Sequence, residues 1–203
     1  MNYKWLPNLL TSSRILLVPL FLYFLFSDFS HGKLLALIVF MIASITDALD
    51  GKIARKHDAV SKFGIFFDPL ADKFLVLSAF YSFMFLENTY IDLLSTTVKL
   101  WMIILISFRD VLVTLIRTIM QYKGITMITS KLGKLKTALQ IITINFILLF
   151  LILESYRISI PSNLLYYKSL YSLMVITTMI TFYTGVHYFY NNYKTIGGLL
   201  FKK

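Results

Sequence analysis

The most informative stretch of the chain reads Asp47-x-x-Asp50-Gly51-x-x-Ala54-Arg55, then eight residues, then Gly64-x-x-x-Asp68-x-x-x-Asp72. Its four aspartates stand out because the whole chain of 203 residues has only ten acidic residues. The sequence on either side is strongly apolar, and a carboxylate near lipid is costly unless it is paired or holds a metal ion. Four neighbouring carboxylates also repel one another unless a cation lies between them. The pattern therefore predicts a divalent metal site at a membrane surface.

The composition indicates a membrane protein. Hydrophobic residues make up 58% of the chain and the mean hydropathy is +0.74, whereas soluble domains are about 45–50% apolar. Several apolar runs reach the roughly 20 residues that cross a bilayer as a helix. We therefore expect an all-α polytopic membrane protein that forms one domain over residues 1–203. Six transmembrane helices are predicted at 7–27, 33–56, 69–87, 98–121, 132–154 and 165–190. The chain has no cysteine, which excludes disulfides and thiolate chemistry.

The basic residues predict the orientation of these spans. The net charge is +10, and only four of the 20 Lys and Arg residues, Lys33, Lys99, Arg157 and Lys168, fall in one of the two alternating sets of connections. Because cytoplasmic loops are enriched in Lys and Arg, we expect both termini and the aspartates on the cytoplasmic side of a bacterial-type inner membrane. The excess charge fits membrane lipids and phosphorylated substrates, and we expect no nucleic-acid partner.

The first span is preceded by a short amphipathic segment, from Trp5 to Arg14. We expect this N-terminal amphipathic segment to lie in the membrane interface before the chain turns inward. Asn8 and Thr11 within it have two interpretations. In one interpretation they contact a nucleotide or its phosphates, and in the other they cap and anchor the helix.

On helices, the aspartates form two pairs. Asp47 and Asp50 are i, i+3 neighbours, and Asp68 and Asp72 are i, i+4 neighbours near Pro69, which suits a first helical turn. At 100° per residue, five positions share an arc of about 140°: Asp47, Asp50, Gly51, Ala54 and Arg55. A loop over 56–67 would let the two helices run antiparallel and bring both pairs to one depth. Oxygen-only ligands favour Mg²⁺, Mn²⁺ or Ca²⁺. The alternative is that the aspartates merely pair with nearby lysines and arginines.

This pattern resembles the signature of the CDP-alcohol phosphatidyltransferase family, D-x2-D-G-x2-A-R-x8-G-x3-D-x3-D. All eight signature positions are filled. The resemblance implies that Asp47, Asp50, Asp68 and Asp72 hold one or two divalent ions, Mg²⁺ or Mn²⁺, which bind the diphosphate of CDP-diacylglycerol. It implies that Asp72 is the general base and that the enzyme is a homodimer. The CDP-lipid site would comprise Asn8, Thr11, Gly51, Ala54, Arg55 and Gly64.

Three further blocks are similar to family members that use sn-glycerol 3-phosphate as the acceptor. They begin at Pro7, at Arg109-Asp110 and at Lys131. The second block usually begins Arg-Glu, so Asp110 is a mild departure. The resemblance implies transfer of a phosphatidyl group from CDP-diacylglycerol to sn-glycerol 3-phosphate, with release of CMP.

The basic residues of the last two blocks predict a pocket for the acceptor's phosphate. The candidates are Arg109, Arg117, Lys131, Lys134 and Lys136. Arg109 lies well inside an apolar run and needs a partner, which Asp110, the aspartates or a bound phosphate would supply. The lysines alternatively flank the membrane or attract anionic lipid, and the arginines alternatively form an intramembrane ion pair.

The sequence leaves three alternative functions open. In the first, the enzyme uses another acceptor alcohol, such as inositol phosphate, serine or phosphatidylglycerol, because the signature concerns the donor. In the second, the chain is a transporter, because intramembrane charges also mark ion paths. In the third, it is a structural membrane protein, which predicts no dependence on Mg²⁺ or Mn²⁺.

Overall fold

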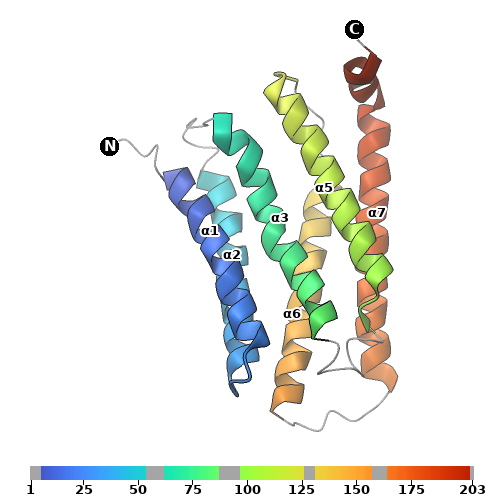
Figure 1. Ribbon diagram of the computed structural model, residues 1–203. Helices are drawn as coiled ribbons and strands as arrows, with labels where there is room; N and C mark the ends of the chain where they lie inside the picture. The colour runs from blue at the N-terminus through green and yellow to red at the C-terminus, as the bar shows by residue number, and fades with distance from the viewer. Residues whose placement is uncertain (1–5, 54–61, 87–96, 126–130, 157–163, 202–203) are drawn as a thin grey trace.

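The fold is a bundle of α-helices, seen in a computed structural model that describes residues 6–53, 62–86, 97–125, 131–156 and 164–201 (Figure 1). Within these ranges the chain forms six helices and no strand, which confirms the all-α prediction. The helices are α1 (Leu6–Phe26), α2 (Gly32–Ile53), α3 (Lys62–Phe85), α5 (Leu100–Tyr122), α6 (Lys131–Ser155) and α7 (Leu164–Phe201).

Four helices match their predicted bounds closely, and two do not. Helix α3 begins at Lys62, so the predicted loop over 56–67 is wrong in its second half, and Pro69 lies within the helix rather than in its first turn. Helix α7 continues to Phe201, beyond the predicted end at residue 190. The predicted amphipathic segment is continuous with the first span, because residues 6–14 belong to α1.

Consecutive helices run in opposite directions along the bundle (Figure 1). Each helix packs against two neighbours in a closed ring, in the order α1, α2, α6, α7, α5 and α3, and α3 also contacts α6 across the ring. One end of the bundle therefore collects the start of α1, the end of α2, the start of α3, the end of α5, the start of α6 and the end of α7 (Figure 1). We call this the motif end, because it carries the aspartate pattern.

The core of the bundle is apolar and aromatic. Phe21, Phe40, Phe80, Ile106 and Ile147, from five different helices, are fully buried. Many large apolar side chains point outward instead, including those of Phe85, Phe108 and Phe182. An exposed apolar exterior around an apolar core is the arrangement expected of helices in lipid.

Two of the described helices are long and apolar enough to cross a membrane, judged by length and composition alone. They span Leu132–Ser155, with a mean hydropathy of 2.1, and Lys168–Gly197, with 1.3. The apolar parts of α1, α2 and α3 are shorter, at Leu16–Phe26, Gly32–Thr46 and Lys73–Phe85. Six spans therefore stay a prediction.

Helix α7 brings a polar strip into the interior. Thr177, Thr178, Thr181 and Thr184 are all buried on it. Thr177 and Thr143 of α6 share a hydrogen bond of 2.7 Å between their hydroxyl oxygens. Buried hydroxyls need partners, so this face of α7 favours a polar interior between α5, α6 and α7.

Candidate functional site

The aspartate pattern lies on two helices at the motif end. Asp47, Asp50 and Gly51 belong to the last two turns of α2, and Gly64, Asp68 and Asp72 belong to the first half of α3. Residues at i, i+3 or i, i+4 share one face of a helix, so each aspartate pair stands on a single face. Figure 1 shows the end of α2 and the start of α3 at the same end of the bundle.

The side chains of this pattern lie outside those that the structure describes. Ala54 and Arg55 fall between α2 and α3, outside the described residues, and Asn8 and Thr11 are placed only as part of the backbone of α1. Among the described side chains, no group of three or more acidic or histidine residues is arranged to hold a metal ion. The backbone of α2 and α3 places the four aspartate positions toward the motif end.

The five predicted basic residues do not form a single surface. Arg109 and Arg117 lie on α5, and Lys131, Lys134 and Lys136 lie at the start of α6. Lys136 is almost completely buried, with 2% of its side chain exposed, and Arg109 is 12% exposed. Arg117 and Lys134 are exposed on the surface, and the side chain of Lys131 is outside the described set. Of the four whose side chains are described, Arg109 and Lys136 are therefore the two that meet in the interior.

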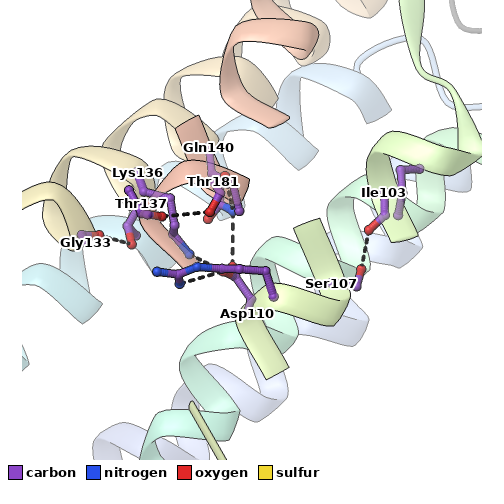
Figure 2. Close-up of polar contacts among 10 residues, drawn as sticks. Ile103, Ser107, Asp110, Gly133, Lys136, Thr137, Gln140 and Thr181 are labelled. Carbon is purple, nitrogen blue, oxygen red and sulfur yellow. Dashed lines mark hydrogen bonds and ion pairs between the residues drawn. The ribbon is translucent and has the colours of Figure 1, made fainter. Parts of the chain in front are cut away.

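Asp110 joins these two cations. Its side chain is fully buried in the middle of α5, and its Oδ1 accepts a hydrogen bond from Lys136 Nζ at 2.5 Å and from Arg109 Nη1 at 3.2 Å. Figure 2 shows Lys136 and Asp110 pointing toward each other from their two helices. A buried charge is stable only when it is paired and hydrogen-bonded. Asp110 is one of the three partners that the sequence left open for Arg109, and its contact agrees with the predicted alternative of an ion pair, whereas the partnership with Lys136 was missed.

Two uncharged residues complete this cluster. Gln140 Nε2 of α6 donates to Asp110 Oδ2 at 3.1 Å and approaches Thr181 Oγ1 of α7 at 3.5 Å (Figure 2). Both side chains are fully buried. We call Arg109, Asp110, Lys136, Gln140 and Thr181 the interior cluster. Gln140 stands one helical turn after Lys136, and this i, i+4 spacing was the signal in the sequence that it shares the face of Lys136.

Helix α3, which carries the second aspartate pair, lies beside two of the helices of the interior cluster. Lys73 of α3 follows Asp72 directly in the chain, and its charge acts on both Asp110 and Lys136. Helix α3 packs against α5 and also contacts α6. The helix that carries Asp68 and Asp72 therefore contacts both helices that hold the charged residues of the interior cluster.

The interior cluster holds more cationic than anionic groups. One carboxylate faces one ammonium and one guanidinium, which sum to +1 when all three are ionised. Arg109 Nε and Gln140 Oε1 are buried and have no hydrogen-bond partner among the described residues. Buried polar atoms are rarely left unpaired, so the unused donor Arg109 Nε suits an anionic ligand, whereas the unused acceptor Gln140 Oε1 does not.

The chain belongs to the CDP-alcohol phosphatidyltransferase family, whose sequence model matches residues 4–186. The family consists of membrane-associated enzymes that generally use divalent metal ions. The fold and the aspartate pattern agree with this assignment, because the eight signature positions fall on or between α2 and α3.

Curated relatives cover most of the chain. It is 32% identical to the CDP-diacylglycerol–glycerol-3-phosphate 3-phosphatidyltransferase of Bacillus subtilis, over 94% of this chain and 96% of the relative. The protein of the same name from Rickettsia typhi is 36% identical, over 72% and 77%. A probable phosphatidylglycerophosphate synthase of Mycobacterium tuberculosis is 32% identical, over 96% and 84%.

Proposed function

We propose that the protein is a phosphatidylglycerophosphate synthase, which transfers the phosphatidyl group of CDP-diacylglycerol to sn-glycerol 3-phosphate and releases CMP. The main support for the proposal is a sequence identity of 31–36% to relatives that are named for this reaction. The interior cluster agrees with it, because a buried surplus of positive charge suits an acceptor that carries its own phosphate.

The donor site lies at the motif end. Asp47, Asp50, Asp68 and Asp72 would hold one or two divalent ions, Mg²⁺ or Mn²⁺, which when bound neutralise the diphosphate and stabilise the CMP leaving group. Small residues at Gly51, Ala54 and Gly64 leave room for the nucleotide, with support from Arg55, Asn8 and Thr11. The acyl tails would stay in lipid alongside the exposed apolar faces of the helices.

Asp72 is the proposed general base. It is the motif aspartate furthest along α3, and α3 packs against α5, which carries Asp110. The acceptor hydroxyl attacks the phosphorus that carries the diacylglycerol, the bond from that phosphorus to the CMP oxygen breaks, and the hydroxyl proton passes to Asp72. This direct displacement needs no covalent intermediate on the protein.

Arg109 and Lys136 are the proposed buried binding residues for the acceptor phosphate. Arg117, Lys131 and Lys134 would contribute from the outer part of α5 and α6, where they attract the anion from the cytoplasm. We propose six membrane spans, with both termini and the motif end on the cytoplasmic side of an inner membrane. We propose that the enzyme works as a homodimer.

The test is an assay of CMP release. Purified protein with CDP-diacylglycerol and Mg²⁺ is offered sn-glycerol 3-phosphate, serine, inositol phosphate and phosphatidylglycerol in parallel. We expect turnover with sn-glycerol 3-phosphate above all others, and a preference for another alcohol would overturn the assigned acceptor. Asp72→Asn should abolish turnover while nucleotide binding persists, because the variant keeps the shape of the side chain and loses the base. Full activity of that variant would remove Asp72 from its role.

A further inference from the structure

The carboxylate of Asp110 is held at both oxygen atoms. Oδ1 accepts hydrogen bonds from Lys136 and Arg109, and Oδ2 accepts one from the amide of Gln140. The side chain is fully buried about 18 Å along α5 from its end at Tyr122. A carboxylate with both oxygens engaged has one orientation. The two cations that share Oδ1 are therefore fixed relative to each other.

We propose that Asp110 is a positioning residue for the acceptor alcohol, which holds Arg109 and Lys136 side by side so that their remaining N–H donors converge on the acceptor's phosphate. The inference rests on the proposed function. An ammonium has three donors and a guanidinium has five, so each cation can bond Asp110 and still contact a ligand. Without the carboxylate, two like charges in a buried site would move apart.

Gln140 fixes the orientation of Asp110 in turn. Its amide nitrogen faces Asp110 Oδ2 and Thr181, and its Oε1 has no partner among the described residues. The opposite orientation of the amide would place Oε1 against the carboxylate, where two acceptors repel each other. The chain of contacts therefore runs from Thr181 on α7 through Gln140 and Asp110 to both cations.

The competing explanation is that the cluster only fastens α5 to α6 and α7. A structural ion pair of this kind predicts that its loss lowers thermal stability and affects both substrates alike. A positioning role predicts a selective effect on the acceptor, because the donor would bind at the aspartates of α2 and α3. The two explanations therefore differ in the KM of one substrate relative to the other.

The experiment measures initial rates of CMP release by the full-length protein with Mg²⁺. Each substrate is varied while the other is saturating, for the wild type, Asp110→Asn and Asp110→Glu. The control is Ser107→Ala, because Ser107 is also nearly buried on α5 and bonds only a carbonyl of its own helix, that of Ile103 (Figure 2). We expect Asp110→Asn to raise the KM for sn-glycerol 3-phosphate by about tenfold or more, with the KM for CDP-diacylglycerol little changed.

Rescue by the conservative variant completes the test. Asp110→Glu keeps the charge and should recover most of the acceptor affinity, whereas Ser107→Ala should match the wild type. Equal changes in both KM values, or a lower melting temperature with an unchanged acceptor KM, would overturn the positioning role while the proposed function stands. A wild type that gives no CMP with sn-glycerol 3-phosphate would instead overturn the proposed function.

A second variant covers the case in which Asp110→Asn does not fold. Gln140→Leu keeps all three charges and frees Asp110 Oδ2, so the ion pair persists while the carboxylate can rotate. We expect a smaller rise in the acceptor KM, by a few fold, with the donor KM unchanged. An acceptor KM equal to that of the wild type would contradict the inference.

Discussion

Gly185 of α7 lies directly against the side chain of Arg109 of α5, because a Cβ atom at position 185 would stand only 2.8 Å from Arg109 Cγ. The same Cβ would lie 3.5 Å from Arg109 Nε. Glycine at this position therefore lets the arginine pass between the two helices toward Asp110. The lack of a side chain at Gly185 therefore makes room for Arg109 in the interior cluster.

This contact predicts that Gly185→Ala weakens acceptor binding. The added methyl group must displace Arg109 near the base of its side chain, where the chain cannot swing aside. We expect the KM for sn-glycerol 3-phosphate to rise about tenfold, since a hydrogen bond to a charged group contributes roughly 1.5–3 kcal/mol. Gly197→Ala on the same helix is the control, because a Cβ there meets nothing within 4 Å. If both variants gave the wild-type KM, the placement of Arg109 against Gly185 would be wrong.

Removal of the metal should stop the reaction. We expect EDTA to abolish CMP release and added Mg²⁺ or Mn²⁺ to restore it, because the four carboxylates would otherwise face a diphosphate without a counter-charge. Asp68→Asn should raise the Mg²⁺ concentration for half-maximal activity by about tenfold or more, since disturbing even the surroundings of metal ligands costs about 10–100-fold. Asp28→Asn, at the opposite end of the bundle, should leave that concentration unchanged. Activity that persists in EDTA would contradict a metal-dependent mechanism.

Lys33 is predicted to stabilise the fold without a part in the chemistry. Its side chain is buried, and Nζ donates to the backbone carbonyls of Leu25 at 2.6 Å and Ser27 at 3.2 Å. These carbonyls lie at the end of α1, where the helix leaves its last acceptors without internal partners. Lys33→Met should therefore cost about 1.5–3 kcal/mol of stability.

The measurement for Lys33 is thermal unfolding in detergent, together with both KM values. We expect a lower melting temperature with unchanged kinetics in Lys33→Met. Lys168→Met is a suitable control, since Lys168 is an exposed lysine of the same end of the bundle. A variant as stable as the wild type would show that the two carbonyls find other donors.

The proposed orientation is testable because the chain contains no cysteine. Single cysteines at Lys123 and Lys168 would report on opposite ends of the bundle, and both positions are exposed. If the motif end is cytoplasmic, a membrane-impermeant maleimide should label Lys168→Cys in intact cells and Lys123→Cys only after permeabilisation. The reverse pattern would place the aspartates on the outer side and overturn the assigned topology.

The number and order of the helices were predictable because each apolar run is long and continuous. The start of α3 was not, since Gly64 and Pro69 are typical of loops and helix starts, yet the helix includes both. The end of α7 was missed for a related reason. Asn191 and Asn192 look like the end of a span, but the amide of Asn192 donates to the carbonyl of Tyr188 on its own helix at 2.9 Å. Such a local bond lets a polar residue stay inside a helix.

The aspartate pattern could be recognised from spacing alone, but the interior cluster could not. In the sequence, Lys131, Lys134 and Lys136 look like one basic block, although positions two apart on a helix face away from each other. Lys136 is buried and Lys134 is exposed for this reason. Asp110, the partner of Lys136 in the ion pair, lies 26 residues away on another helix. Only the packing of α5 against α7 and of α7 against α6 shows which charges meet.

The closed ring of helices separates the binding residues proposed for the two substrates by segment. Helices α2 and α3 carry the aspartates, and α5, α6 and α7 carry the interior cluster. A chimera that exchanges α5 to α7 between relatives would therefore swap alcohol preference while keeping the machinery for the nucleotide.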